Sequence, residues 1–213
     1  MQALEKNIAT TNWIPVILVF LLAIIAVLKV IDAEKLKGYV FTLFNKGFID
    51  SEVEEDTSFF NSFYSLLFVF SSTVLALAIS LIIVERDAEI QLSFSYFLSI
   101  LGVVFGYFTI KSFLEIAISR MFLIKKQVRF YLVSKFSYLY SISFFLFISF
   151  IIFEYSPLEA SFFMYVALFF FLLRFVFHVR NNKKLIFSQL FYFILYICAS
   201  EIAPLLTLYK LML

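Results

Sequence analysis

The chain has 213 residues, of which 63% are hydrophobic and 15% are charged. A soluble protein of this size cannot bury so much apolar surface, so the composition excludes an ordinary water-soluble domain. The chain also has 32 Phe and 12 Tyr but only 4 Gly and 3 Pro, which makes its apolar stretches bulky and largely unbroken. This pattern favours membrane-spanning helices over the alternating strands of a barrel. We predict an all-α, polytopic membrane helix bundle that forms one domain over residues 1–213.

Six apolar segments are long enough to cross a bilayer, since about 30 Å of hydrocarbon takes about 20 helical residues. The first is longer than the apolar region of a signal peptide, and no small-residue cleavage site follows it, so we expect it to be retained. It follows Thr11 and Asn12, which are residue types that cap helices, and Pro15 falls in its first turn. The six predicted spans are 13–31, 59–84, 92–118, 133–154, 161–179 and 186–210.

The Lys and Arg residues of the connections predict the orientation of the chain. Ten of them fall on one face of the predicted bundle and about three on the other, so the positive-inside rule makes the first face cytoplasmic. Both termini then face the periplasm if the protein is bacterial. The ten are Lys35, Lys37, Lys46, Arg120, Lys125, Lys126, Arg129, Arg180, Lys183 and Lys184, and the three are Lys6, Arg86 and Lys210.

The connection over residues 32–58 is the only sizeable predicted segment outside the bilayer. Its helical periodicity predicts a short amphipathic helix that rests on the inner leaflet at the cytoplasmic surface. The apolar side of that helix comprises Leu36, Tyr39, Val40, Leu43 and Phe44. Five acidic residues follow within residues 50–56. They are interpreted as solvated charge near a helix start, with a docking site for a basic partner as the alternative.

Small residues recur at helical spacing in the second, third and fourth spans, which permits close approach of helix backbones. The third span carries the stripe Ser95, Ser99, Gly102, Gly106 and Thr109. Similar rows are Ser65, Ser72, Ala76 and Ser80 in the second span and Ser134, Ser137 and Ser141 in the fourth. We interpret these rows as packing surfaces within one bundle, and a dimer interface is the alternative.

Charged side chains within the spans are candidates for an intramembrane site. Lys111 and Glu115 share a face of the third span, and Arg174 and His178 share a face of the fifth. Depth below the predicted cytoplasmic boundary allows Glu115 to pair with Arg174 or with Lys111, which would fix helix register. The alternative is that each charge reaches the lipid headgroups separately.

Glu201 lies apart from these charges, because 1.5 Å of rise per residue places it about 24 Å from the cytoplasmic boundary. Pro204 removes one backbone N–H and leaves the carbonyl of Ser200 without its helical donor, so the last span is predicted to kink there. Desolvation favours a protonated carboxyl, which makes a proton-handling role one hypothesis. An acid at the outer interface that is hydrated or hydrogen-bonded to tyrosine is the other.

The segment FYFILYICASEIAPLLTLYKLM, residues 191–212, resembles the C-terminal signature of domain-of-unknown-function family 4271. This family occurs chiefly in the inner membranes of Bacteroidota, and its Tyr, Cys, Glu and Pro positions correspond to Tyr196, Cys198, Glu201 and Pro204. The resemblance implies a multi-pass protein of a Gram-negative inner membrane. It implies no activity.

Two classes of function fit the sequence. The first is a non-enzymatic subunit or scaffold of an envelope complex, whose partners are the lipid bilayer and another membrane protein, with a homo-oligomer left open. The alternative is a small proton-coupled transporter or channel that uses Glu201 and the charges at Lys111, Glu115 and Arg174. An enzyme is disfavoured because no HExxH or GxSxG motif occurs. With one His and one Cys in the chain, we expect no metal, no cofactor and no nucleic-acid partner.

Overall fold

A computed structural model describes residues 12–54, 61–86, 92–121, 125–156 and 160–181, and within these ranges it contains seven α-helices and no strand. The predicted all-α class is therefore confirmed for the described part of the chain. The helices are α1 (Trp13–Ile31), α2 (Ala33–Val40), α3 (Lys46–Glu54), α4 (Ser62–Arg86), α5 (Phe94–Met121), α6 (Lys125–Tyr155) and α7 (Ala160–Asn181).

Four of these helices are long and apolar enough to cross a membrane, which supports a membrane protein. Their apolar spans are Trp13–Ile31 in α1, Ser62–Glu85 in α4, Phe94–Phe113 in α5 and Val133–Tyr155 in α6. Helix α7 covers the predicted fifth span and contains the shorter apolar stretch Ser161–Arg174. The predicted sixth span, 186–210, lies outside the described residues. The total of six spans stays a prediction.

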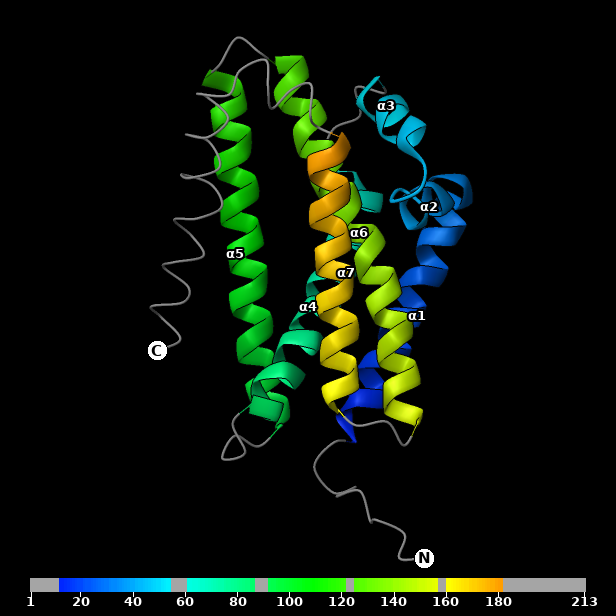
Figure 1. The fold of residues 1–213 in the computed structure, drawn as a ribbon, viewed down its shortest axis with the longest axis vertical. Coiled ribbons are helices and arrows are strands. Elements are labelled where there is room, and N and C mark those ends of the chain that lie inside the picture. Colours follow the sequence, from blue (N-terminus) through cyan, green and yellow to red (C-terminus); the bar gives the residue numbers. More distant parts are fainter. Residues whose placement is uncertain (1–11, 55–60, 87–91, 122–124, 157–159, 182–213) are drawn as a thin grey trace, which may run out of the picture.

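The long helices alternate in direction, so that successive connections fall at opposite ends of the bundle. Figure 1 shows α2 and α3 at one end, together with the last turns of α1, α5 and α7 and the first turns of α6. We call this end the capped end. Helices α5 and α7 end at the capped end and α6 begins there, which agrees with the alternation assumed by the orientation prediction.

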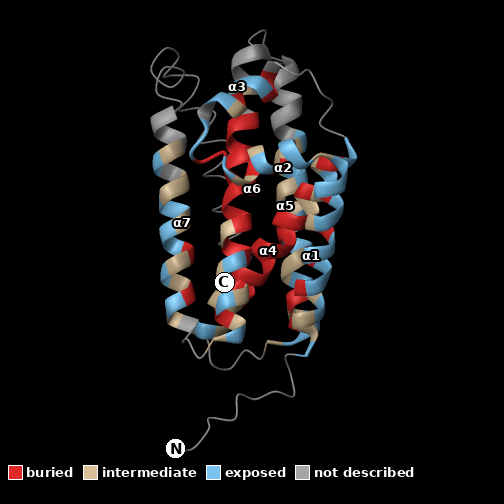
Figure 2. Cartoon of the chain, turned by 90° about the vertical axis from the view of Figure 1, so that its right-hand side faces the viewer, coloured by how far each residue is buried: buried red, intermediate tan, exposed pale blue. Residues whose placement is uncertain are grey.

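Helices α4 and α6 form the centre of the bundle. Within their apolar spans 61% and 67% of the residues are buried, compared with 28% for α1 and 11% for α5. Figure 2 shows this contrast as buried residues along α4 and α6 and exposed residues along α1 and α7. The ring of Phe70 in α4 stacks on Phe144 in α6, with 4.7 Å between the ring centroids. The exposed apolar side chains of the outer helices are suited to contact with lipid.

Most of the small residues in the rows of α4 and α6 are buried within the bundle. Ser72, Ala76 and Ser80 of α4 are buried, as are Ser134, Ser137 and Ser141 of α6. Helices α4 and α6 contact one another, and α6 also contacts α2. The interpretation of both rows as packing surfaces within the bundle is therefore confirmed for these six residues, because small side chains allow the backbones to approach. Ser65 departs from the row, since its side chain is exposed.

The starts of α1 and α6 can be compared with the starts of the corresponding predicted spans. Helix α1 covers the predicted 13–31, and Asn12 precedes it as expected. However, the backbone of Asn12 is helical and its side chain makes no capping hydrogen bond, so the expected cap is absent. Trp13 instead stacks on Phe97 of α5, with 5.1 Å between ring centroids. Helix α6 begins at Lys125, before the predicted residue 133, because polar turns can extend a helix beyond its membrane span.

The connection after α1 forms two short helices that close the capped end. Both α2 and α3 contact α6, and α2 also contacts α1. The side chains of Leu36, Tyr39 and Leu43 are buried in the protein core, whereas Phe44 is exposed. The expectation that this apolar face rests on the inner leaflet is corrected for these three residues, because the end of the bundle offers them an apolar protein surface.

Candidate functional site

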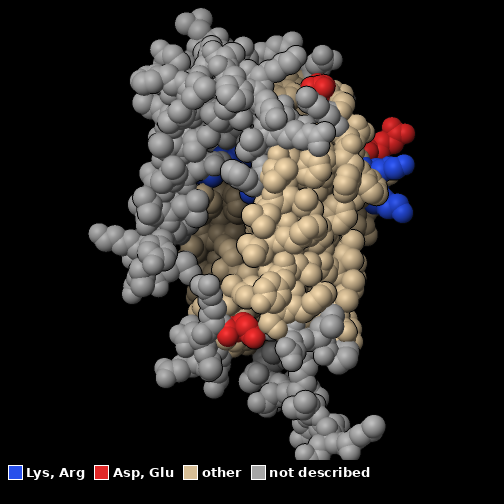
Figure 3. All heavy atoms as spheres, in the orientation of Figure 1, with Lys and Arg blue, Asp and Glu red and all other residues tan. Residues whose placement is uncertain are grey.

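A cavity of about 720 Å³ lies among the four helices α4, α5, α6 and α7. Its walls are mainly aliphatic and aromatic, and three cationic side chains project into the lining from three different helices. Figure 3 shows the corresponding face of the molecule hollowed, with Lys and Arg atoms at the upper end of the hollow. The lining residues are Leu75, Ile79 and Ile83 from α4; Tyr96, Ser99, Ile100, Val103, Val104, Tyr107, Phe108 and Lys111 from α5; Lys135, Phe136 and Leu139 from α6; and Phe171 and Arg174 from α7.

The three cations are Lys111, Lys135 and Arg174. The sequence singled out Lys111 and Arg174 as intramembrane charges, and the structure brings both to the same cavity. Lys135 was not singled out, although its place two residues after the predicted start of the fourth span at residue 133 was an available signal. Its side chain is 5% exposed, so it is enclosed by the protein.

Lys111 also has local partners on its own helix. Its Nζ donates a hydrogen bond to the hydroxyl of Tyr107 at 3.2 Å and lies 5.3 Å from the centroid of that ring. A cation over an aromatic face is attracted by the ring quadrupole, and this helps to hold the ammonium at the cavity wall. Lys135 and Arg174 likewise interact with other groups of the chain.

Two other predicted members of the charged site lie on described helices but outside the described side chains. Glu115 belongs to α5, one turn beyond Lys111, and His178 belongs to α7, one turn beyond Arg174. Their positions place them toward the capped end from the two cavity cations. The pairing of Glu115 with Arg174 or Lys111 stays a prediction, and so does the place of His178 at its edge.

The small-residue stripe of α5 lies on a different surface from those of α4 and α6. Ser95, Ser99, Gly102 and Thr109 are exposed and Gly106 is half-buried. A Cβ atom added at Gly102 or at Gly106 would meet no described atom within 4 Å. The described part of the bundle therefore leaves room along this stripe for another helix, which could come from this chain or from another molecule.

Comparison with known families matches residues 14–212 to the domain of unknown function DUF4271. The chain belongs to this family. The resemblance seen in residues 191–212 is thus confirmed, and the match extends over nearly the whole chain. No curated protein and no solved structure matches the chain. The family therefore supplies no activity.

The most specific family positions fall outside the described residues. These are Glu201 and Pro204, together with Tyr196 and Cys198. The predicted kink at Pro204 and the environment of the Glu201 carboxyl stay predictions. The cavity cations in this member of DUF4271 lie on α5, α6 and α7, so they come from a part of the matched region other than the final segment.

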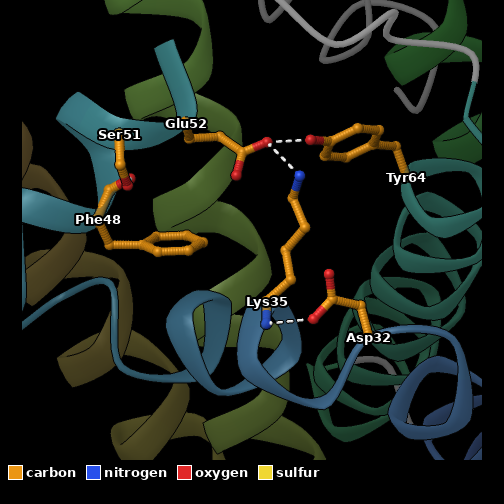
Figure 4. A network of polar contacts seen from close by, with 6 residues as sticks. All are labelled: Asp32, Lys35, Phe48, Ser51, Glu52 and Tyr64. Atoms are coloured by element: carbon orange, nitrogen blue, oxygen red, sulfur yellow. Dashed lines mark hydrogen bonds and ion pairs between the residues drawn. The ribbon is translucent and has the colours of Figure 1, made fainter. Parts of the chain in front are cut away.

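A second polar cluster fastens α2 and α3 to the bundle. Glu52 of α3 is 5% exposed, and its Oε1 lies 3.2 Å from the Nζ of Lys35 in α2. The hydroxyl of Tyr64 in α4 donates a hydrogen bond to the same carboxylate. Asp32 begins α2 by accepting a hydrogen bond from the Lys35 backbone N–H at 2.8 Å. Figure 4 shows these side chains converging from three helices and from the turn before α2.

This cluster changes the interpretation of the acidic run at residues 50–56. Glu52 is not solvated charge, because it is buried and paired, whereas Asp50 in the same helix is exposed. The helical period places the two acids on different sides of α3. The sequence analysis missed the role of Glu52, since a run of acids gives no indication of which member meets a lysine and a tyrosine from other helices.

Aromatic packing surrounds the cluster on its buried side. Tyr39 lies edge-on to Phe48, Tyr64 and Tyr140, at centroid distances of 5.0, 6.2 and 5.8 Å. Burial, with a further contribution from the charge of Glu52, raises the pKa of Tyr39 well above its usual range. The Oγ of Ser141 in α6 donates to the carbonyl of Val40 at 2.7 Å and ties α2 to the central helix. The cluster acts as a structural lock on the capped end.

Proposed function

We propose that the protein binds an anionic solute in the cavity and acts as a small membrane transporter or channel. The observation that carries this proposal is the convergence of Lys111, Lys135 and Arg174 on one cavity of about 720 Å³. A pocket with apolar walls and a few convergent polar groups is the usual form of a small-molecule site. Ionisable side chains held within a membrane bundle are costly, so they are candidates for function.

The electrostatics of the lining favour an anion. All of the charged side chains among the described lining residues are cations, and the other polar ones are Tyr96, Tyr107 and Ser99. In a low-dielectric surrounding, an anion gains more from three cations than it would in water. Both Glu115 and Glu201 are candidates for the proton coupling considered from the sequence, and neither is needed for anion binding itself.

Cysteine accessibility tests this proposal, because Cys198 is the only native cysteine. In a Cys198→Ala background, Val104→Cys places a thiol on the cavity wall. Val74→Cys is the matched control, since both valines are buried in the bundle but only Val104 belongs to the cavity lining. A small membrane-impermeant thiol reagent should label residue 104 and leave residue 74 unlabelled. Absence of labelling at residue 104 from both sides of the membrane would exclude a water-connected cavity and refute the proposal.

A second candidate, a non-enzymatic subunit or scaffold of an envelope complex, is favoured by the exposed small-residue stripe of α5. Small residues in membrane helices let a neighbouring helix approach closely, and Gly102 and Gly106 have no described neighbour that prevents it. The neighbour would be another membrane protein, a second copy or the chain's own predicted span 186–210.

Purification in mild detergent distinguishes these neighbours. Gly102→Leu should remove a stoichiometric partner if that partner packs on the stripe. Leu98→Ile, at an exposed position of the same helix, should retain it. Recovery of the wild-type protein as a monomer without a partner would contradict the scaffold function. We further infer a Gram-negative inner membrane as the location, with the capped end in the cytoplasm, because the family resemblance and the distribution of cations both support it.

A further inference from the structure

The cavity is elongated along α5. Its lining includes Tyr96 near the start of that helix and Lys111, which lies 15 residues later. At 1.5 Å of rise per residue, these positions are about 22 Å apart. This length exceeds half of the roughly 30 Å hydrocarbon thickness of a bilayer. The cavity is thus long enough to hold an extended chain, and a compact solute would fill only part of it.

The charges occupy only one end of this length. Lys111 is toward the last turns of α5, Lys135 is toward the first turns of α6, and Arg174 is toward the last turns of α7. Each position is nearer to the end of its helix that lies at the capped end, and Figure 1 shows those helix ends. The lining nearer Tyr96 is provided by residues such as Ile83 and Ile100. The cavity therefore has a cationic end and an apolar remainder.

Figure 3 shows this hollow on a lateral face of the described bundle. A ligand that matches this arrangement needs an anionic head and a hydrocarbon tail. A free inorganic anion would satisfy the cations but leave the apolar length empty. A neutral hydrocarbon would fill the apolar length but would carry no charge to interact with the cationic end of the cavity.

We propose that the cavity binds an anionic amphiphile, with its phosphate or carboxylate headgroup at Lys111, Lys135 and Arg174 and its hydrocarbon tail along α5 toward Tyr96. The inference rests on the proposed function, because it names the ligand class of the same cavity. The three cations also interact within the chain, so the headgroup joins a polar group that is already positioned. The ligand comes either from the phospholipids of the bilayer or from free long-chain fatty acids.

The test uses the full chain in nanodiscs of zwitterionic phosphatidylcholine, with three probes measured separately. The probes are phosphatidylglycerol, palmitate and inorganic phosphate, and binding is measured by native mass spectrometry and by titration. We expect phosphatidylglycerol or palmitate to bind, with inorganic phosphate at least about 10-fold weaker because it lacks a tail. Preference for phosphatidylglycerol identifies the bilayer as the source, and preference for palmitate identifies free fatty acid.

Substitutions at the cationic end and at the apolar end of the cavity test where the headgroup and the tail bind. Lys135→Gln with Arg174→Gln should weaken the preferred amphiphile by at least about 10-fold, since two charge-assisted contacts are lost. The control, Lys29→Gln with Lys37→Gln, removes two exposed cations and should change binding by less than about 2-fold. Ile100→Trp should weaken the amphiphile by filling the apolar part of the cavity. Lys135→Arg with Arg174→Lys keeps both charges and should retain binding. This variant separates the loss of charge from a disturbance of folding.

Two results would overturn the inference. The first is equal binding of phosphate and amphiphile, which would show that the tail contributes nothing. The second is binding of none of the three probes by a wild-type protein that elutes as a single folded species. In either case labelling of Val104→Cys would still support a water-connected cavity, so failure of the ligand class is distinguishable from failure of the proposed transport function.

Discussion

Replacing Lys35 by Met should loosen the capped end of the bundle. The carboxylate of Glu52 is 5% exposed and has two described partners, the Lys35 ammonium at 3.2 Å and the Tyr64 hydroxyl. Removing the ammonium leaves a buried negative charge with a single neutral donor. Loss of one member of a buried ion pair costs about 3–5 kcal/mol. Because the Lys35 side chain is 14% exposed, we expect the lower end of that range, about 3 kcal/mol.

The loss is local, so it should appear in the opening of α2 and α3 before the bundle as a whole unfolds. Hydrogen–deuterium exchange of the protein in nanodiscs, read by mass spectrometry, reports this opening for the amides of Lys46–Glu54. A cost of about 3 kcal/mol corresponds to a rise of about 100-fold in the opening constant. Exchange in the central helices α4 and α6 should change much less.

Two controls make the comparison specific. Lys37→Met removes an exposed cation from the same helix and should change the opening free energy by less than about 0.5 kcal/mol. Lys35→Met combined with Glu52→Leu removes both charges and should recover part of the loss, because no buried carboxylate is left unpaired. Equal exchange in Lys35→Met and Lys37→Met would refute the stabilising role of the Lys35–Glu52 pair. Losses of opening free energy in the Lys35 and Glu52 single variants that simply add in the double variant would refute it as well.

Three further predictions concern the packing of the capped end, the ionisation of Tyr39 and the orientation of the chain. Gly38→Ala places a Cβ atom against the ring of Phe48, so an overpacking cost of about 1–3 kcal/mol should exceed the gain in helix propensity of about 1 kcal/mol and lower the thermal transition in detergent. Gly47→Ala, whose added Cβ has its nearest neighbour at 3.5 Å, should raise that transition. Tyr39 has a raised pKa in the folded state, so its stabilising contribution is complete below pH of about 10 and is lost above it. The fall in melting temperature between neutral and strongly alkaline pH should therefore be smaller in Tyr39→Phe, and an unchanged fall would contradict this. In a Cys198→Ala background, an impermeant thiol reagent should label Ser51→Cys only in inverted inner-membrane vesicles and Asn12→Cys only in right-side-out ones, and the opposite pattern would reverse the predicted orientation.

The sequence by itself determined the helical membrane class, the family and the approximate limits of the described apolar helices. Burial of apolar side chains in a bilayer follows from local composition and length, so residues 13–31 could be assigned to a helix without knowledge of any neighbour. The predicted start of the fourth span at residue 133 agrees with the apolar span Val133–Tyr155, although helix α6 itself begins earlier, at Lys125. Composition marks the membrane-spanning part of a helix, and the polar turns from Lys125 belong to the same helix without being apolar.

Helical periodicity also identified the small-residue rows, but it could not say what each row contacts. Ser72 and Ser137 are buried within the bundle, whereas Gly102 in a row of similar spacing is exposed. Spacing defines a face of one helix, and the packing of the bundle decides whether that face meets protein. The sequence therefore gave the same expectation for surfaces that the tertiary structure separates.

Only the tertiary structure brought together the residues of the two polar clusters. Lys111, Lys135 and Arg174 come from three helices, and no pattern within any one helix predicts that they line one cavity. In the sequence, Glu52 is one of several acids in a run interpreted as solvated. Only the packing of α3 beside α2 and α4 brings it into contact with Lys35 and Tyr64. The physical reason is that burial and electrostatic environment depend on neighbours distant in the chain, whereas hydropathy and helical period are properties of the local sequence.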